Sequence, residues 1–112
     1  MDRSDMYRRL KNKYGFREVI SYGIRYLVYN TQAIVCDVDC KNPFMIRIRD
    51  HFKFDPIDGS LESTYGDLFA ITDEEGIDKR IKELFVEYED CLLKRKMWLQ
   101  NKKENKIIDM FK

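Results

Sequence analysis

The segment from Thr72 to Lys112 constrains this chain most, because it predicts a helix that is longer than its own apolar face. Thr72 and Glu75 have the spacing of a capping box, which indicates a helix start. An apolar stripe follows at helical spacing, formed by Ile77, Ile81, Leu84, Phe85, Tyr88, Cys91 and Leu92. After Leu93 the stripe fades, although no proline stops the helix. A helix that continues without a buried face predicts a partner surface.

The length of this helix can be compared with the size of the whole chain. At 112 residues, the chain is expected to form one domain with a core that needs neither metal nor disulfide. A helix over residues 73–103 would be about 46 Å long, whereas the globule should be only about 35 Å across. We therefore expect a globular domain over residues 1–93 and a projecting basic helix end and tail over residues 94–112.

Charge is segregated along the chain although the net charge is only +1. Residues 1–17 hold six basic and two acidic side chains, residues 72–90 hold three basic and eight acidic, and residues 94–112 hold seven basic and two acidic. The acid-to-base order of the last two segments matches the helix dipole. The same order also suits head-to-tail or antiparallel pairing of this helix with a copy of itself, and the sequence leaves these interpretations open.

The first 93 residues read as an α+β domain. Residues 4–14 predict a helix with Asp2 or Ser4 as its N-cap and Gly15 as its C-cap. Alternating apolar and polar residues predict strands over 17–22, 24–30, 32–39 and 44–54, with a bulge near Asp50. The short connections require antiparallel pairing. Residues 60–71 fit either a strand or a helical turn.

The expected architecture is an N-terminal helix, a four-stranded or five-stranded antiparallel meander, and one long C-terminal amphipathic helix packed on one sheet face. We expect this packing to join apolar side chains of the fourth strand to the apolar stripe of the long helix. The strand residues are Ile46, Ile48, Phe52 and Phe54, and the helix residues are Ile77, Ile81, Leu84, Phe85 and Tyr88.

Enzymatic function is not expected, and neither is a cofactor or a bound metal. His51 is the only histidine, and the sequence gives it no partner to position it as a base. The three cysteines are odd in number and lack metal-site or redox spacing. We expect reduced thiols and a cytoplasmic protein. No apolar run reaches membrane-spanning length, so no membrane partner is expected.

Nucleic-acid binding is the first alternative. The polar side of strand 44–54 carries a row of potentially cationic residues, and Arg25 and the aromatic Tyr29 stand on a neighbouring strand. Cations interleaved with aromatic rings suit contact with phosphates and stacking on bases. The candidate residues are Arg25, Arg47, Arg49, His51 and Lys53.

A metal-dependent nuclease is the second alternative. Asp37, Asp39 and Lys41 lie at the end of a predicted strand, and Asp39 and Lys41 have D-x-K spacing. This spacing resembles that of restriction-endonuclease-like nucleases, in which a carboxylate binds a divalent metal and the Lys steadies the attacking water. The preceding strand lacks the Asp that the family carries there.

Protein docking is the function that the sequence favours. Met97, Trp98 and Leu99 are adjacent and flanked by cations, and buried aromatics dominate interface energies. Residues 107–111 resemble the short peptides that dock on replication sliding clamps, although the usual leading Gln is absent. We expect a small non-enzymatic interaction module that forms a homodimer, of a kind frequent among phage and mobile-element accessory proteins. The candidate partner-binding residues are Met97, Trp98, Leu99, Ile107, Met110 and Phe111.

Overall fold

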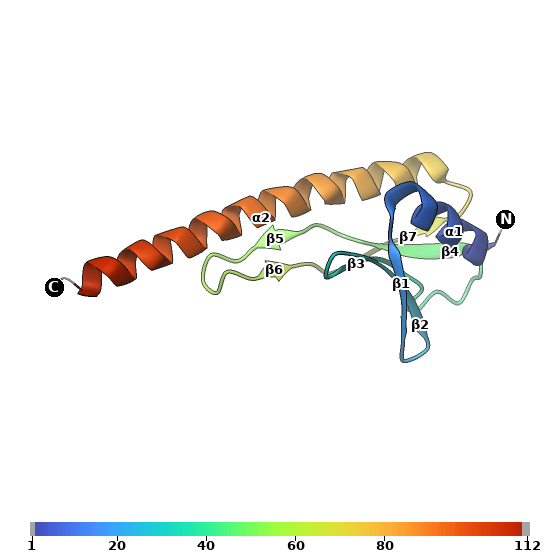
Figure 1. The fold of residues 1–112 in the computed structure, drawn as a ribbon. Helices are drawn as coiled ribbons and strands as arrows, with labels where there is room; N and C mark the ends of the chain where they lie inside the picture. Colours follow the sequence, from blue (N-terminus) through green and yellow to red (C-terminus); the bar gives the residue numbers. More distant parts are fainter. Residues whose placement is uncertain (1, 111–112) are drawn as a thin grey trace.

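The structure is a computed structural model that describes residues 2–110, without the side chains of residue 65 and of residues 103–110. The candidate side chains of Ile107, Met110 and Phe111 therefore lie outside the described part. Figure 1 shows a sheet and a hairpin beneath one long helix. The elements are α1 (Arg3–Tyr14), β1 (Arg17–Ser21), β2 (Ile24–Tyr29), β3 (Gln32–Cys36), β4 (Met45–Arg49), β5 (Lys53–Phe54), β6 (Leu61–Glu62), β7 (Tyr65–Ala70) and α2 (Glu74–Met110).

Both predicted caps of the first helix are present, with Asp2 as the N-cap. The Asp2 carboxylate accepts a bond from the Asp5 backbone N–H at 2.9 Å, and the Asp5 carboxylate accepts one from the Asp2 N–H at 3.0 Å. Gly15 ends the helix with φ of 72°, and its N–H donates to the Lys11 carbonyl at 2.8 Å. Such a left-handed cap is easiest for glycine. One face of α1 is buried, through Met6, Tyr7 and Leu10.

The main sheet confirms the predicted antiparallel meander and has five strands, in the order β1-β2-β3-β4-β7. Tight turns connect its first strands. Tyr22 and Gly23 both have positive φ, 51° and 76°, in the two-residue turn between β1 and β2. Asn30, with φ of 54°, stands in the next turn. This geometry matches the twist of the flanking strands.

The third strand departs from regular alternation at Ile34. Ile34, Val35 and Cys36 are consecutive and all buried, and the sequence pattern placed Val35 on the face opposite Ile34 and Cys36. The pairing of β2 with β3 shifts register between Leu27 and Val28. Val35 pairs with Leu27 and Cys36 pairs with Tyr26, so these two side chains still alternate, and Ile34 is the extra residue that the bulge inserts.

The predicted single strand over residues 44–54 is two strands in two different sheets. β4 ends at Arg49 and pairs with β7, while β5 pairs with β6 in a two-stranded hairpin. The break coincides with Asp50, whose N–H donates to the Thr64 carbonyl at 3.1 Å. Residues 60–71, which the sequence left undecided, supply β6 and β7.

The long helix begins one residue later than predicted. Its N-cap is Asp73, whose carboxylate accepts from the Gly76 N–H at 3.0 Å and whose carbonyl accepts from the Ile77 N–H at 3.0 Å. The prediction of a capping box formed by Thr72 and Glu75 is therefore wrong. Aspartate ranks above threonine as an N-cap, so residue type alone favours Asp73 over the predicted Thr72.

The predicted contact between sheet and long helix is confirmed. α2 packs against β4 and β5, and one core cluster includes Ile46, Ile48, Phe52, Ile77, Ile81, Leu84 and Tyr88, with Phe54 and Phe85 packed against it. In Figure 1 the α2 helix crosses above β5 and β6, and its red end continues past their turn. The protein is accordingly elongated, with extents of 64 × 29 × 22 Å.

Basic side chains of α1 form ion pairs with acidic side chains at the start of α2. Arg9 and Lys13 of α1 approach the Asp78 carboxylate at 2.7 and 3.0 Å, and Arg9 also lies 3.7 Å from Glu74. Part of the acidic charge at the start of α2 is thus matched by α1 within the same chain. These ion pairs involve the acidic start of α2 and not its basic end.

Candidate protein-interaction surface

A line of exposed apolar side chains runs along the outer side of α2. It consists of Val86, Leu93 and Met97, which are 71%, 58% and 57% exposed. The steps of seven and four residues keep all three within an arc of about 40°, because each helical residue turns the chain by about 100°. We call these three residues the outer line. They lie on the side of α2 opposite its buried residues Leu84, Tyr88 and Cys91.

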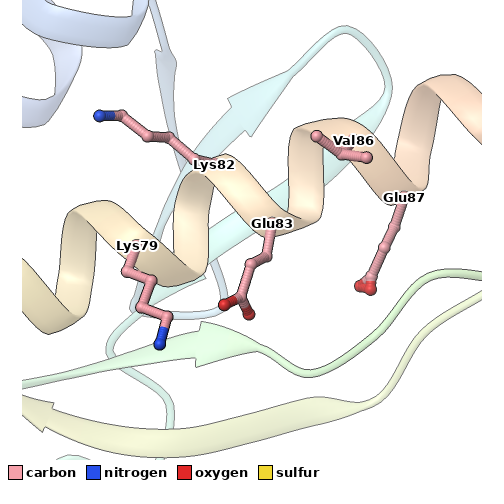
Figure 2. A pocket seen from close by; sticks show the side chains of 5 residues that line it. All are labelled: Lys79, Lys82, Glu83, Val86 and Glu87. Atoms are coloured by element: carbon pink, nitrogen blue, oxygen red, sulfur yellow. The ribbon is translucent and has the colours of Figure 1, made fainter.

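A shallow hollow accompanies the outer line at Val86. It has a volume of about 560 Å³ and is lined by Lys79, Lys82, Glu83, Val86 and Glu87. Figure 2 shows Lys79, Glu83 and Glu87 directed toward the green strand, and Lys82 and Val86 at the opposite edge of the helix. All five side chains come from α2, so the hollow is an open trough along the helix and not an enclosed ligand pocket.

The structure does not bring Met97, Trp98 and Leu99 into one patch. Trp98 turns to the body, where its indole N–H donates to the Pro56 carbonyl at 2.8 Å. Met97 faces outward, and Leu99, which is 46% exposed, follows about 200° further around the helix. Three consecutive helical residues point in three directions, so adjacency in the sequence did not imply a common surface.

Sequence reasoning missed two of the three residues in the outer line. Val86 and Leu93 were not predicted, because the longer apolar stripe on the buried side of the helix is the stronger periodic signal. The signal was nevertheless present, since apolar residues spaced by seven and four indicate a helical seam. Met97 is the only residue that belongs both to the outer line and to the partner-binding residues predicted from the sequence.

The candidate nucleic-acid residues are not gathered on one face, and the three arginines among them have internal partners. Arg25 lies over the Tyr7 ring and bonds Glu18 at 2.6 Å, on the side of the sheet covered by α1. Arg47 lies on the opposite side and donates to the carbonyls of Val38 and Gly66 at 3.2 and 2.8 Å. Arg49 donates to the Ala33 carbonyl at 3.0 Å.

The remaining residues of this set are divided between other elements. His51 follows β4, with Nδ1 2.8 Å from the Glu87 carboxylate of α2 and Nε2 3.6 Å from Asp50. Lys53 is exposed on β5 of the separate hairpin. Tyr29, expected as an exposed stacking ring, packs instead against Phe85 with the ring centroids 4.8 Å apart. These contacts favour structural roles for these side chains.

Of the candidate nuclease residues, Asp37 holds structural contacts and the other two are exposed. The Asp37 carboxylate accepts from the Arg25 backbone N–H at 2.9 Å and lies 3.7 Å from Arg3. Asp39 and Lys41 are exposed in the loop that follows β3. Among the residues that the structure describes, no three His, Cys, Asp or Glu side chains converge as a metal site would require.

The three cysteines are free thiols in apolar or partly buried positions. Burial is the main cause that raises the pKa of Cys36, Cys40 and Cys91 above that of an exposed thiol. A raised pKa lowers the population of thiolate, which is the nucleophilic form. These positions are typical of packing residues.

Comparisons with protein-family models, with curated proteins and with solved structures each found no match to this chain. The assignment of function therefore depends on the geometry of the residues themselves. Of the helices within the described residues, none combines the length and the apolar character needed to cross a membrane.

Proposed function

We propose that this chain is a non-enzymatic protein-interaction module and that the outer line of α2 is its binding surface. One observation carries the proposal: Val86, Leu93 and Met97 form a straight, exposed apolar row on the side of α2 that faces away from its own core. Scattered exposed apolar residues need no explanation, whereas a row at helical-seam spacing is typical of a surface that docks another helix.

The energetics support a binding role for this row. Fully burying one large aliphatic side chain contributes about 1.5–3 kcal/mol. Three such side chains on a rigid, already folded helix also avoid the ordering cost that a disordered segment would carry on binding. The free thiols favour a reducing compartment, and we place the module in the cytoplasm on that ground.

A photo-crosslinking experiment tests the surface whatever the identity of the partner. A photoreactive amino acid is introduced at position 93 of the full chain, and a control variant carries it at position 95. Leu93 and Arg95 are both exposed on α2, but they are about 200° apart around the helix. We expect protein adducts from position 93 in the source cells and few from position 95. Equal yields, or no adduct from position 93, would show that the outer line is not a binding surface.

A further inference from the structure

The two halves of α2 carry opposite charge. Within the helix, residues 74–90 hold seven acidic and three basic side chains, a balance of −4, and residues 94–110 hold six basic and two acidic, a balance of +4, so the sign reverses between them. α2 spans Glu74–Met110, and its midpoint, residue 92, falls within this reversal. A helix of this kind is complementary to a copy of itself when the two run in opposite directions. Parallel copies would place acid against acid and base against base, which opposes association.

The two ends of the outer line are placed symmetrically about the same point as the charges, because Val86 and Met97 lie equally far from the midpoint between residues 91 and 92. We propose that the partner of this surface is a second copy of the chain, with the two α2 helices antiparallel about a two-fold axis beside residues 91 and 92. This inference rests on the proposed function of the outer line. In this register Val86 of one copy lies opposite Met97 of the other, and Leu93 lies beside Asp90 of the other. A flexible methionine is well suited to fill the open trough at Val86.

Charged side chains flank the seam, by which we mean the contact between the two outer lines in the proposed dimer, and their charges are complementary across it. Glu89 and Lys96 are both exposed, and they lie on the same flank of the outer line. Antiparallel pairing brings Glu89 of one copy next to Lys96 of the other, and the two-fold axis repeats the contact. Within one helix these residues are seven positions apart, about 10 Å along the axis, so they do not pair with each other.

The strength of the association follows from the composition of the seam. Asp90 lies beside the outer line, where its carboxylate is 2.9 Å from Lys94 of the same helix. A polar residue in an apolar seam fixes the register at a cost in affinity. With three apolar residues from each copy, we expect a dissociable dimer with Kd of about 1–100 µM.

Sedimentation equilibrium of the full chain over about 1–300 µM tests the pairing. We expect the mass to rise from 13.6 kDa toward twice that value. Leu93→Glu should weaken dimerisation by at least about 10-fold, because a buried charge in the seam has no partner. Leu99→Glu is the matched control, since it makes the same change at another exposed leucine of α2 that faces away from the seam. Circular dichroism checks that both variants keep the fold.

A charge exchange tests the antiparallel arrangement. Glu89→Lys or Lys96→Glu alone should weaken the dimer about 3–10-fold at low salt, because each places like charges side by side. The double variant should recover the wild-type affinity. A dimer that Leu93→Glu disrupts but that the double variant does not recover would overturn the antiparallel register.

The outcomes separate this inference from the proposed function. A chain that stays monomeric throughout, while position 93 crosslinks to a different protein, overturns the self-pairing and leaves the interaction surface in place. A monomer that gives no adduct from position 93 overturns both. Dimerisation with equal sensitivity to Leu93→Glu and Leu99→Glu also overturns the proposal, because the seam would then not be the outer line.

Discussion

The hydroxyl of Tyr14, at the end of α1, donates a 2.7 Å hydrogen bond to the Asp78 carboxylate near the start of α2. The same carboxylate accepts bonds from Arg9 at 2.7 Å and from Lys13 at 3.0 Å. Three donors from α1 therefore converge on one acidic side chain of α2. α1 precedes the strands in the sequence and α2 follows them. The cluster therefore joins a helix from the beginning of the domain to a helix from its end.

Removing the Tyr14 hydroxyl should destabilise the domain measurably. Tyr14→Phe keeps the ring next to Phe16 and Phe85 but removes one bond to a charged acceptor, so we expect a loss of about 1–2 kcal/mol in the free energy of unfolding. Urea denaturation measures the change. Tyr22→Phe is the control, because Tyr22 is fully exposed at a hairpin turn. Equal stability of the two variants would contradict a structural role for the Tyr14–Asp78 bond.

The Asp78 cluster should also make stability depend on pH in the acid range. Partial burial would raise the pKa of Asp78, but hydrogen bonds from Tyr14, Arg9 and Lys13 outweigh it and lower the pKa to about 2. The unfolded carboxyl titrates near about 3.9. A lowered folded pKa stabilises the protein above that value, and the contribution is lost as pH falls toward 2.

The corresponding measurement is the melting temperature between about pH 5 and pH 2. The wild type should lose stability more steeply over this range than Asp78→Asn, which cannot titrate at this position. At pH 5 the variant should be less stable than the wild type by about 1–3 kcal/mol, and the difference should narrow toward pH 2. Parallel curves for the two proteins would show that Asp78 does not carry the effect.

Local signals were sufficient to predict most of the fold. Asp2 and Gly15 delimit α1 by residue type alone, and period-two alternation located β1, β2 and the start of β4. The division of residues 44–54 between two sheets was not predictable in this way. It depends on which strand pairs with each half, and the contact between Asp50 and the Thr64 carbonyl is made by residues distant in sequence.

The candidate site was harder to predict than the fold. The sequence indicated that α2 outlasts its apolar face, but it identified the exposed surface by adjacency and therefore grouped Trp98 with Met97. Trp98 packs on the β5–β6 turn, which reaches it only in the folded protein. The basic residues of β4 were expected to face solvent, yet backbone carbonyls of neighbouring segments hold Arg47 and Arg49.

Trp98 should report the attachment of the β5–β6 turn to α2. It is the only tryptophan, so its fluorescence can be assigned without ambiguity. A Cβ on Gly59 would lie 2.5 Å from Cζ3 of the Trp98 ring. Gly59→Ala should therefore displace the indole, shift its emission to longer wavelength and destabilise the protein by about 1–3 kcal/mol. Gly23→Ala is the control, because Gly23 has a similar φ of 76° and nothing within 4 Å of its Cβ position. An unshifted spectrum in Gly59→Ala would contradict the ring contact.

Gly66 should be the least replaceable glycine of the sheet. A Cβ at this position would overlap the Ile48 carbonyl oxygen and lie 2.8 Å from the Asp50 nitrogen, both of which are backbone atoms. Gly66 lies where the pairing of β7 with β4 shifts register, and backbone atoms there cannot move aside as a flexible side chain can, so Gly66→Ala should separate β7 from β4. We expect a loss of at least about 3 kcal/mol, measured by urea denaturation, with faster amide exchange in both strands. Asp67→Ala, at the next and exposed position of β7, should change stability by less than about 1 kcal/mol. Tolerance of alanine at position 66 equal to that at position 67 would show that the two strands do not approach as closely as described.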